Sequence, residues 1–318
     1  MTTFESHPIR RPLARLAAGT AVTLLVSAVP TGAQAATGSA PQQGYCSSAH
    51  DPRLAARLSS DIGSALAGRK DTVAFAVTDD TTGVSCAFHA DEHFDSASVV
   101  KVTIMGAVLR RAEDEHRYLT DWEDGNLQQM ITASDNDAAT ALWQSLGMPR
   151  LQSFLELAGM KDTQLGADGY WGLTQITAAD EMKALDVFTG NSNVITPAAK
   201  AYGLGLMSQV EADQRWGTPF GAPASVTVHV KNGWLPRATH GWRVHSLGIF
   251  TGPGKDYRMA VLTQDNPDES DGIDTIQAIA AVVHRDLNGG VGGVAPRAPR
   301  AEAPETSDGS APFGPVAG

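Results

Sequence analysis

Three short stretches of the chain carry residue types that can perform serine-based acyl transfer. Residues 98–101 read Ser-Val-Val-Lys, residues 134–136 read Ser-Asp-Asn, and residues 231–233 read Lys-Asn-Gly. The first two match the patterns S-x-x-K and S-D-N, and the third is K-T-G with Asn in the middle position. One such pattern alone has little value, but three in this order indicate an enzyme that forms an acyl intermediate on a serine.

The first stretch supplies a nucleophile and a base. Ser98 precedes a run of apolar, helix-compatible residues from 99 to 112. Backbone N–H groups in the first turn of a helix lack partners, so they can stabilise the oxyanion that forms when the Ser98 hydroxyl attacks a carbonyl. Side chains three residues apart share one helix face, so a buried Lys101 can accept the hydroxyl proton. The alternative is a helix-capping Ser followed by a surface Lys.

The second stretch supplies a proton relay and a substrate contact. Ser134 can pass a proton to a leaving nitrogen, and Asn136 can hold a substrate amide. Asp135 is expected to brace the turn. All three residue types also favour the N-cap of a helix, and capping does not exclude the catalytic role.

The third stretch supplies a second cation at the end of a strand. Lys231 follows the alternating, β-branched run 225–230, and it can bind a substrate carboxylate and keep Lys101 deprotonated. Gly233 lets a substrate approach the strand closely, and the Trp234 N–H can complete the oxyanion hole. The alternative is that Asn232 and Gly233 form an ordinary hairpin turn.

The elements that must position these residues follow from the periodicity of the sequence. Helices are expected at 52–67 and 272–287, with an almost wholly helical block at 98–210 that breaks at Gly125, 147–149, 161–176 and 190–193. Strands are expected at 72–78, 84–88, 226–231, 242–251 and 257–264, with turns at 79–83, 232–233 and 252–254. This order predicts an α+β fold in which terminal helices flank a five-stranded antiparallel sheet. The helical second lobe, about 95–212, would form the site in a crevice against the sheet.

The ends of the chain indicate export. Residues 1–35 have a positive segment, an apolar run and a small-residue cleavage site ending at Ala35, which predicts a signal peptide of the general or twin-arginine type. No Cys follows the apolar run, so no membrane anchor is expected, and residues 36–50 are expected to be a linker. Residues 288–318, rich in Gly, Pro and Ala, are expected to be disordered. A formal net charge of −11 argues against nucleic acid as a partner, and we expect a secreted monomer.

The two cysteines are expected to form a disulfide. Cys46 precedes the first expected helix, and Cys86 starts the second strand of the expected hairpin, so an antiparallel helix brings them to the same end. An oxidising compartment makes their pairing the default. With these two cysteines and no clustered His, neither a metal site nor a cofactor is expected.

The three stretches closely resemble the class A β-lactamase and penicillin-binding-protein superfamily over roughly residues 51–287. The likeness extends to residues 119–121 and 131–139 around the second pattern and to residues 177–185, which are similar to the helix after the omega loop of that family. The resemblance implies that Ser98 is the nucleophile, Lys101 its general base and Ser134 the proton shuttle. By the same resemblance, Asn136 and Lys231 bind the substrate, and the amides of Ser98 and Trp234 form the oxyanion hole.

Two departures from the family pattern bear on deacylation. Class A enzymes carry an omega-loop Glu that activates the deacylating water, whereas residues 165–177 contain no Glu and only one carboxylate, Asp168, which is better interpreted as part of an Asp-Gly turn. The step from Ser98 to Ser134 is also shorter than the family usually shows, which predicts a more open cleft. Arg237 and Arg243 could help to bind a carboxylate, although a surface or turn role is the alternative for each.

These observations predict an exported serine hydrolase that acts on β-lactams or on related amides and esters. The substrate is therefore a small molecule or a cell-wall peptide. The alternative functions are a D-Ala-D-Ala carboxypeptidase and a penicillin-binding protein that deacylates slowly and acts as a sensor. A more distant alternative is a scaffold without activity.

Overall fold

The computed structural model describes residues 44–190 and 192–290, which fold around one antiparallel sheet. The strands of this sheet follow the order β1-β3-β2-β8-β7-β6, with the bounds β1 (Cys46–Ser48), β2 (Thr72–Asp79), β3 (Val84–Phe88), β6 (Thr227–Pro236), β7 (Trp242–Gly252) and β8 (Lys255–Asn266). A second, two-stranded sheet pairs β4 (Phe94–Asp95) with β5 (Gln175–Ile176). The expected signal peptide and the expected tail beyond residue 290 lie outside the described residues.

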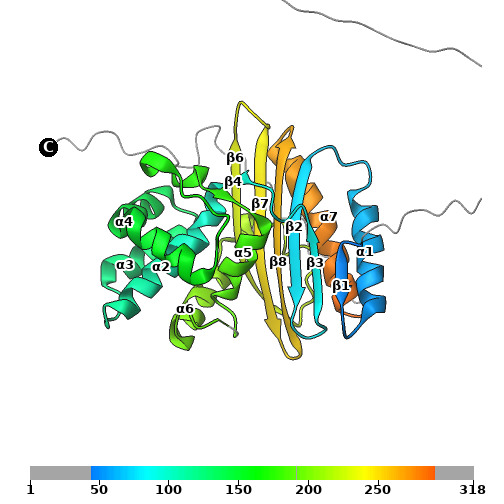
Figure 1. Ribbon diagram of the computed structural model, residues 1–318, viewed down its shortest axis with the longest axis horizontal. Helices are drawn as coiled ribbons and strands as arrows, with labels where there is room; N and C mark the ends of the chain where they lie inside the picture. Colours follow the sequence, from blue (N-terminus) through cyan, green and yellow to red (C-terminus); the bar gives the residue numbers. More distant parts are fainter. Residues whose placement is uncertain (1–43, 191, 291–318) are drawn as a thin grey trace, which may run out of the picture. The chain divides into compact units, whose positions relative to one another are not determined.

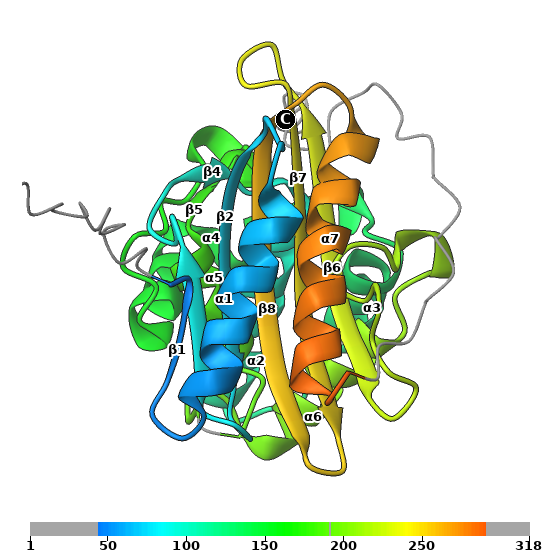
Figure 2. The same ribbon diagram turned by 90° about the vertical axis from the view of Figure 1, so that its right-hand side faces the viewer.

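Helices cover both faces of the large sheet (Figures 1 and 2). One face carries α1 (Pro52–Leu66) and α7 (Glu269–Leu287), which lie side by side across the strands in Figure 2. The other face carries the helical lobe, which consists of α2 (Lys101–Asp114), α3 (Asp121–Thr132), α4 (Asn136–Ala158), α5 (Ala178–Asp186) and α6 (Pro197–Ser208). Short 3₁₀ turns connect these elements: η1 (Ala97–Val100), η2 (Ala167–Gly169), η3 (Trp171–Leu173) and η4 (Ala212–Gln214).

Each face of the sheet has its own apolar core. Leu58 and Ile62 of α1 pack with Phe75 of β2 and with Ile276 of α7 in the first core. The second core joins the helical lobe to the opposite face and includes Leu247 of β7. Since burial of apolar surface is the main driving force, this second core fixes the helical lobe against the sheet at the place where the predicted site lies.

Capping residues determine where the main helices begin. Asp51 caps α1 by accepting a hydrogen bond from the Leu54 N–H at 2.9 Å, and Pro52 occupies the first helical position. Thr120 and Glu123 form a capping box at the start of α3. No helix in the described part of the chain is long and apolar enough to cross a bilayer.

The α+β architecture is as predicted, but the large sheet has six strands where five were expected. The additional strand is β1, which lies in the segment expected to be a linker and pairs with β3 so that Cys46 stands opposite Cys86. These two residues form the expected disulfide.

Two expected breaks are wrong. Gly125 lies inside α3, because the capping box starts the helix earlier, at Asp121. The turn expected at Asn232 and Gly233 does not occur, because both residues pair with β7 and β6 continues to Pro236. The break expected at 147–149 is present as a kink in α4, where Gly147 has φ 68°.

Candidate active site

The first predicted stretch forms the tight turn η1 and the start of α2. Ser98 lies within η1 and is buried, and Lys101 opens α2 with a fully buried side chain. Side chains three residues apart eclipse one another in a 3₁₀ turn, so Ser98 and Lys101 share one face of this segment. Ala97, just before Ser98, has φ 46°, a left-handed conformation that is costly for a residue with a side chain. Strain of this kind is concentrated where a side chain must be presented in a defined direction.

The second predicted stretch connects α3 to α4. Asp135 is the N-cap of α4 and accepts a hydrogen bond from the Ala138 N–H at 2.7 Å, as expected for a residue that braces the turn. Ser134 also has a left-handed backbone, with φ 57°. This conformation directs both the carbonyl and the hydroxyl of Ser134 at the same amine, that of Lys101.

The Lys101 amine is held by oxygen atoms from the second stretch. Its Nζ donates to the Ser134 carbonyl at 2.6 Å, to Asn136 Oδ1 at 2.7 Å and to Ser134 Oγ at 3.1 Å. The amine of Lys101 is therefore fixed by residues more than thirty positions away in the sequence.

Lys231 reaches the same hydroxyl from the sheet. Its Nζ donates to Ser134 Oγ at 2.9 Å and to the Asn232 carbonyl at 2.8 Å. Burial lowers the pKa of Lys231 to about 7, because water no longer stabilises the charged amine. Ser134 Oγ thus lies between two amines, and it forms a hydrogen-bonded bridge from the helical lobe to β6.

Gly233 brings β6 against the backbone of the predicted nucleophile. A Cβ atom at Gly233 would lie 2.8 Å from the Ser98 nitrogen and 2.9 Å from the Val99 nitrogen, closer than such atoms can approach. Only glycine allows this contact without movement of the backbone. Trp234 follows in β6, opposite Val244, and its ring packs 5.9 Å from that of Trp216.

The side chain of Asn232 explains why this stretch remains a strand. Its Nδ2 donates to the carbonyl groups of Gln214 and Trp216 at 2.8 and 3.0 Å. The middle residue of the third pattern therefore ties β6 to the segment that follows α6, and it leaves Lys231 and Gly233 aligned with Ser98.

Trp171 covers the Lys101 amine on the side of the loop between α4 and α5. The Lys101 nitrogen lies 4.9 Å from the centroid of the Trp171 ring, and the ring is fully buried. The indole N–H donates to Thr140 Oγ1 at 3.0 Å, and the Trp171 carbonyl accepts from the Ser96 hydroxyl at 3.3 Å. A cation over an aromatic face is attracted by the ring, so these contacts hold the indole and the amine together.

Asp168, the carboxylate considered for deacylation, lies on the exposed turn η2 with φ 54°. The hydrogen bonds described above for Ser134 and Lys231 go to other residues. The arrangement is that of a turn residue rather than of a base.

The two candidate arginines converge on a carboxylate that the sequence patterns do not indicate. Arg243 NH2 lies 2.9 Å from Asp95 Oδ2, and Arg237 Nε lies 3.8 Å from the same oxygen. Asp95 is in β4, three residues before Ser98. Its other oxygen accepts from Gln175 Nε2 at 2.7 Å, and its carbonyl accepts from the Nε2–H of His245 at 2.8 Å.

The sequence patterns indicate neither Asp95 nor Trp171 as a site residue. Both act through partners from distant segments, so no local pattern could have found them. Among the described residues, no group of three or more His, Cys, Asp or Glu side chains is arranged to hold a metal ion.

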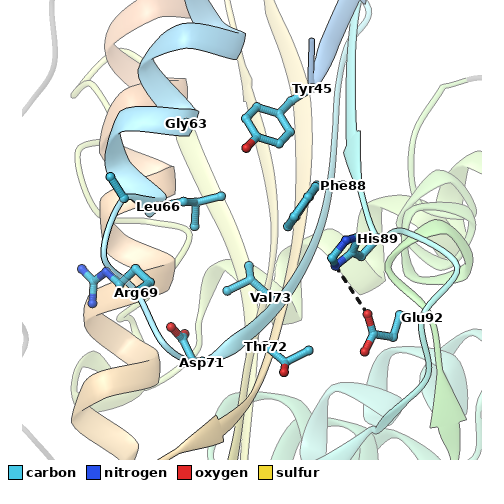
Figure 3. Close-up of a pocket in the computed structure, with 11 residues that line it drawn as sticks. Tyr45, Gly63, Leu66, Arg69, Asp71, Thr72, Val73, Phe88, His89 and Glu92 are labelled. Carbon is cyan, nitrogen blue, oxygen red and sulfur yellow. Dashed lines mark ion pairs between the residues drawn. The ribbon is translucent and has the colours of Figure 1, made fainter. Parts of the chain in front are cut away.

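A pocket of about 580 Å³ lies elsewhere, between the end of α1 and the start of β2 (Figure 3). Tyr45 and Phe88 form one wall, and Asp71 and Glu92 lie near its rim. All of its lining residues lie between positions 45 and 92. In the strand order this region is separated from β6 by β8 and β7, so the pocket is distinct from the cluster around Ser98.

Comparisons with known proteins identify the family. The sequence model of the "Beta-lactamase enzyme family" matches residues 57–122 and 126–287. A Mycobacterium tuberculosis protein named "Putative lipoprotein LppW" is 28% identical over 216 residues, which cover 64% of this chain and 67% of that protein.

The fold is similar to those of solved β-lactamases. A class A β-lactamase from Bacteroides cellulosilyticus is similar with a TM-score of 0.64 and 20% identity, over 73% of this chain and 98% of the other. A β-lactamase from Sphaerobacter thermophilus gives 0.62 and 20%, over 72% and 97%. At such identities the likeness establishes the fold, and the family match covers most of the described residues. The chain therefore belongs to the beta-lactamase enzyme family, and its fold is similar to that of class A β-lactamases.

Proposed function

We propose that this protein is a serine acyl-enzyme hydrolase in which Ser98 attacks the carbonyl of a β-lactam, amide or ester. The observation that carries the proposal is the position of Ser134 Oγ, 3.1 Å from the amine of Lys101 and 2.9 Å from that of Lys231. A hydroxyl between two amines is suited to move a proton from one side of a reacting group to the other.

Acylation follows from these contacts. As Ser98 Oγ attacks, its proton passes to the unprotonated amine of Lys101, and a bond forms between Oγ and the carbonyl carbon. We assign stabilisation of the resulting oxyanion to the N–H groups of Ser98 and Trp234, because Trp234 follows Gly233, whose backbone lies against Ser98. The proton then moves through Ser134 Oγ to the leaving nitrogen or oxygen as its bond to carbon breaks.

The contacts of Lys101 fit a base in its unprotonated form. Such an amine retains two N–H donors, which match the Ser134 carbonyl and Asn136 Oδ1, and its lone pair, in place of the N–H that donates to Ser134 Oγ, can accept the proton of Ser98. Ser134 Oγ in turn accepts from Lys231. In this set of hydrogen bonds Lys231 supplies the positive charge. Asn136 keeps Lys101, the base, in place and remains available to a substrate amide.

A long-lived acyl-enzyme is the second candidate outcome, and Trp171 favours it. The indole fills the space over the Lys101 amine, where an attacking water would need to be activated. Asp168 is exposed on η2. The described part of the loop between α4 and α5 therefore brings no carboxylate that could activate this water in place of Lys101. Deacylation is therefore slow, which corresponds to a penicillin-binding or sensor protein rather than to a rapid β-lactamase.

Intact-protein mass spectrometry tests acylation directly. The protein is mixed with a penicillin or with a nitrophenyl ester, and the mass is followed over minutes to hours. The expected result is one covalent adduct with at least one of these reagents, and its absence from Ser98→Ala. An adduct that forms equally on Ser98→Ala would show that another residue is the nucleophile. The absence of any adduct from the parent protein would refute the proposed function.

Replacement of Trp171 tests the second candidate. Trp171→Ala should shorten the half-life of the adduct by about tenfold or more, since water then reaches the amine, whereas Trp171→Phe should retain most of the lifetime. Trp122→Ala is the matched control, because Trp122 is half exposed on α3. An unchanged half-life in a folded Trp171→Ala variant would remove Trp171 from the explanation.

We further propose that the protein acts outside the cytoplasm. This is supported by the amino-terminal sequence features, by the disulfide between Cys46 and Cys86, and by the similarity to a protein named as a lipoprotein. The substrate class that fits such a location is a cell-wall peptide or a small amide or ester.

A further inference from the structure

The segment that leads to the nucleophile contains an acidic side chain that pairs with the arginines beside the site. Asp95 Oδ2 lies 2.9 Å from Arg243 and 3.8 Å from Arg237, and the side chains of Asp95 and Arg243 are only 12% and 5% exposed. Charged hydrogen bonds in a partly buried setting are strong, so Asp95 is a firm partner for the guanidinium of Arg243.

Arg243 lies on the same face of the sheet as Lys231. In the β6–β7 register, Lys231 stands opposite Leu247 and Leu235 stands opposite Arg243, and alternate residues of a strand share one face. His245, two residues along β7, contacts the Asp95 carbonyl, which places this face toward β4 and Ser98. An arginine in this position would be suited to bind a substrate carboxylate if its donors were free.

Those donors are already engaged. Arg243 NH2 contacts Asp95, and NH1 donates to the carbonyl groups of Thr239 and Gly241. A bidentate contact to a carboxylate needs two donors on one edge of the guanidinium. No edge remains open to a substrate, because NH2 already contacts Asp95, and Nε, although it has no hydrogen-bond partner among the described residues, is buried.

The carboxylate of Asp95 is also held in place from the opposite side. Gln175 Nε2 donates to Asp95 Oδ1 at 2.7 Å, and Asp95 and Gln175 are partners in the β4–β5 pair. The buried ring of His245 anchors the Asp95 backbone, since its Nδ1 accepts from the Thr263 N–H and its Nε2–H therefore donates. Asp95 thus cannot swing away from Arg243 without breaking contacts to two other strands.

We propose that Asp95 withholds Arg243 from the substrate and that the site therefore prefers acyl donors without a free carboxylate, namely neutral esters and amides. This inference rests on the proposed acylation of Ser98. Lys231, the cation of β6 beside the nucleophile turn, already donates to Ser134 Oγ and the Asn232 carbonyl. A negatively charged group beside β7 would have to compete with the carboxylate of Asp95 for Arg243.

The test uses one chromogenic cephalosporin in two forms, as the free acid and as its methyl ester. The acylation rate of each form is measured for the parent and for Asp95→Asn, and the ratio of acid to ester is compared. The ester should acylate the parent at least as fast as the acid. Asp95→Asn should raise the ratio by about tenfold, because Arg243 becomes available to the carboxylate of the acid. An unchanged ratio would overturn the inference.

A second variant keeps the inference testable if Asp95→Asn does not fold. Arg243→Gln should leave the acid-to-ester ratio of the parent unchanged, because Arg243 does not contact the substrate. A ratio that falls in this variant would show that Arg243 binds the carboxylate, and it would equally overturn the inference. The matched control is Asp61→Asn, which removes another carboxylate paired with an arginine, Arg285, on the opposite face of the sheet.

The failure of this inference is distinguishable from that of the proposed function. If neither form of the cephalosporin nor the nitrophenyl ester acylates Ser98, the proposed function is wrong. If both forms acylate Ser98 and the acid is strongly preferred by the parent protein, only the role of Asp95 is wrong.

Discussion

Replacement of Gly233 by alanine tests whether the contact between β6 and the nucleophile turn is needed for acylation. The new Cβ would lie 2.8 Å from the Ser98 nitrogen, 2.9 Å from the Val99 nitrogen and 3.2 Å from the Ala97 Cβ. Two of these neighbours are backbone atoms, so no side-chain rotation can relieve the overlap. Either β6 or η1 must move by roughly half an ångström or more to restore ordinary contact distances of about 3.4 Å or longer.

The expected effect is larger on the reaction than on stability. A displacement approaching 1 Å at a reacting group can cost about 100-fold in rate, because the nucleophile and the oxyanion donors no longer meet the carbonyl in the required geometry. Extra volume in a packed site lowers the free energy of unfolding by about 1–3 kcal/mol. Gly233→Ala should therefore remain folded at room temperature and acylate about 100-fold more slowly.

The acylation rate is measured by mass spectrometry with the reagent that labels the parent, and stability is measured by urea unfolding. Gly125→Ala is the matched control, because a Cβ there meets nothing within 4 Å and the position is an exposed turn of α3. That control should acylate normally and gain up to about 1 kcal/mol of stability. Normal acylation by folded Gly233→Ala would show that the close contact has no role in the chemistry.

Three further predictions concern charges and the disulfide. Burial lowers the pKa of Lys231 to about 7, so between pH 7 and 10 the unfolded chain binds more protons than the folded protein. The free energy of unfolding should therefore rise with pH across this range. Lys231→Met should lose that rise in urea titrations. Reduction of the disulfide between Cys46 and Cys86, which are 40 residues apart, should lower the free energy of unfolding by roughly 4 kcal/mol. Glu123→Gln should lower it by about 3 kcal/mol, because two guanidinium groups lose their counterion. Burial raises the pKa of Glu123, but hydrogen bonds from Arg117 and other donors lower it to about 2, so in the parent this contribution should be lost only as the pH falls toward 2.

Each of these predictions can fail in a specific way. A Lys231→Met variant whose stability rises with pH as steeply as that of the parent would mean that another group releases the proton. Equal urea midpoints with and without reductant would contradict the role given to the disulfide. A Glu123→Gln variant of normal stability would show that water, rather than the carboxylate, satisfies the two arginines.

The three reactive stretches could be recognised from the sequence because their chemistry is local. Ser98 and Lys101 are one turn apart, and such spacing determines a shared face whatever surrounds it. The strand containing Lys231 was also predictable from its alternating residues. Local periodicity similarly placed the terminal helices and most strands of the large sheet, and hence the α+β class.

The errors arose where distant partners override a local preference. Asn232 and Gly233 favour a turn, yet pairing with Ser246 and His245 of β7 and the two hydrogen bonds of the Asn232 side chain keep the strand extended. The strand β1 was missed because its three residues are too few to show a period, and its pairing depends on Cys86.

Asp95 and Trp171 illustrate a different limit. Neither belongs to a pattern, and each acquires its role from a side chain more than 60 residues away in the sequence. Their positions depend on how β4, β5 and the loop before α5 pack beside η1, and this packing is decided by the whole second core. The spacing of residues along the chain does not predict such contacts.

The short strand β1 also has a consequence for the behaviour of the protein at high concentration. It covers the outer side of β3, where unpaired backbone groups would otherwise be available to another molecule. Three residues form a weak ladder, but the Cys46–Cys86 bond holds that ladder in register. Oxidation therefore leaves a three-residue strand at this edge in place of the longer β3, and chains that remain reduced during production should be the ones that precipitate.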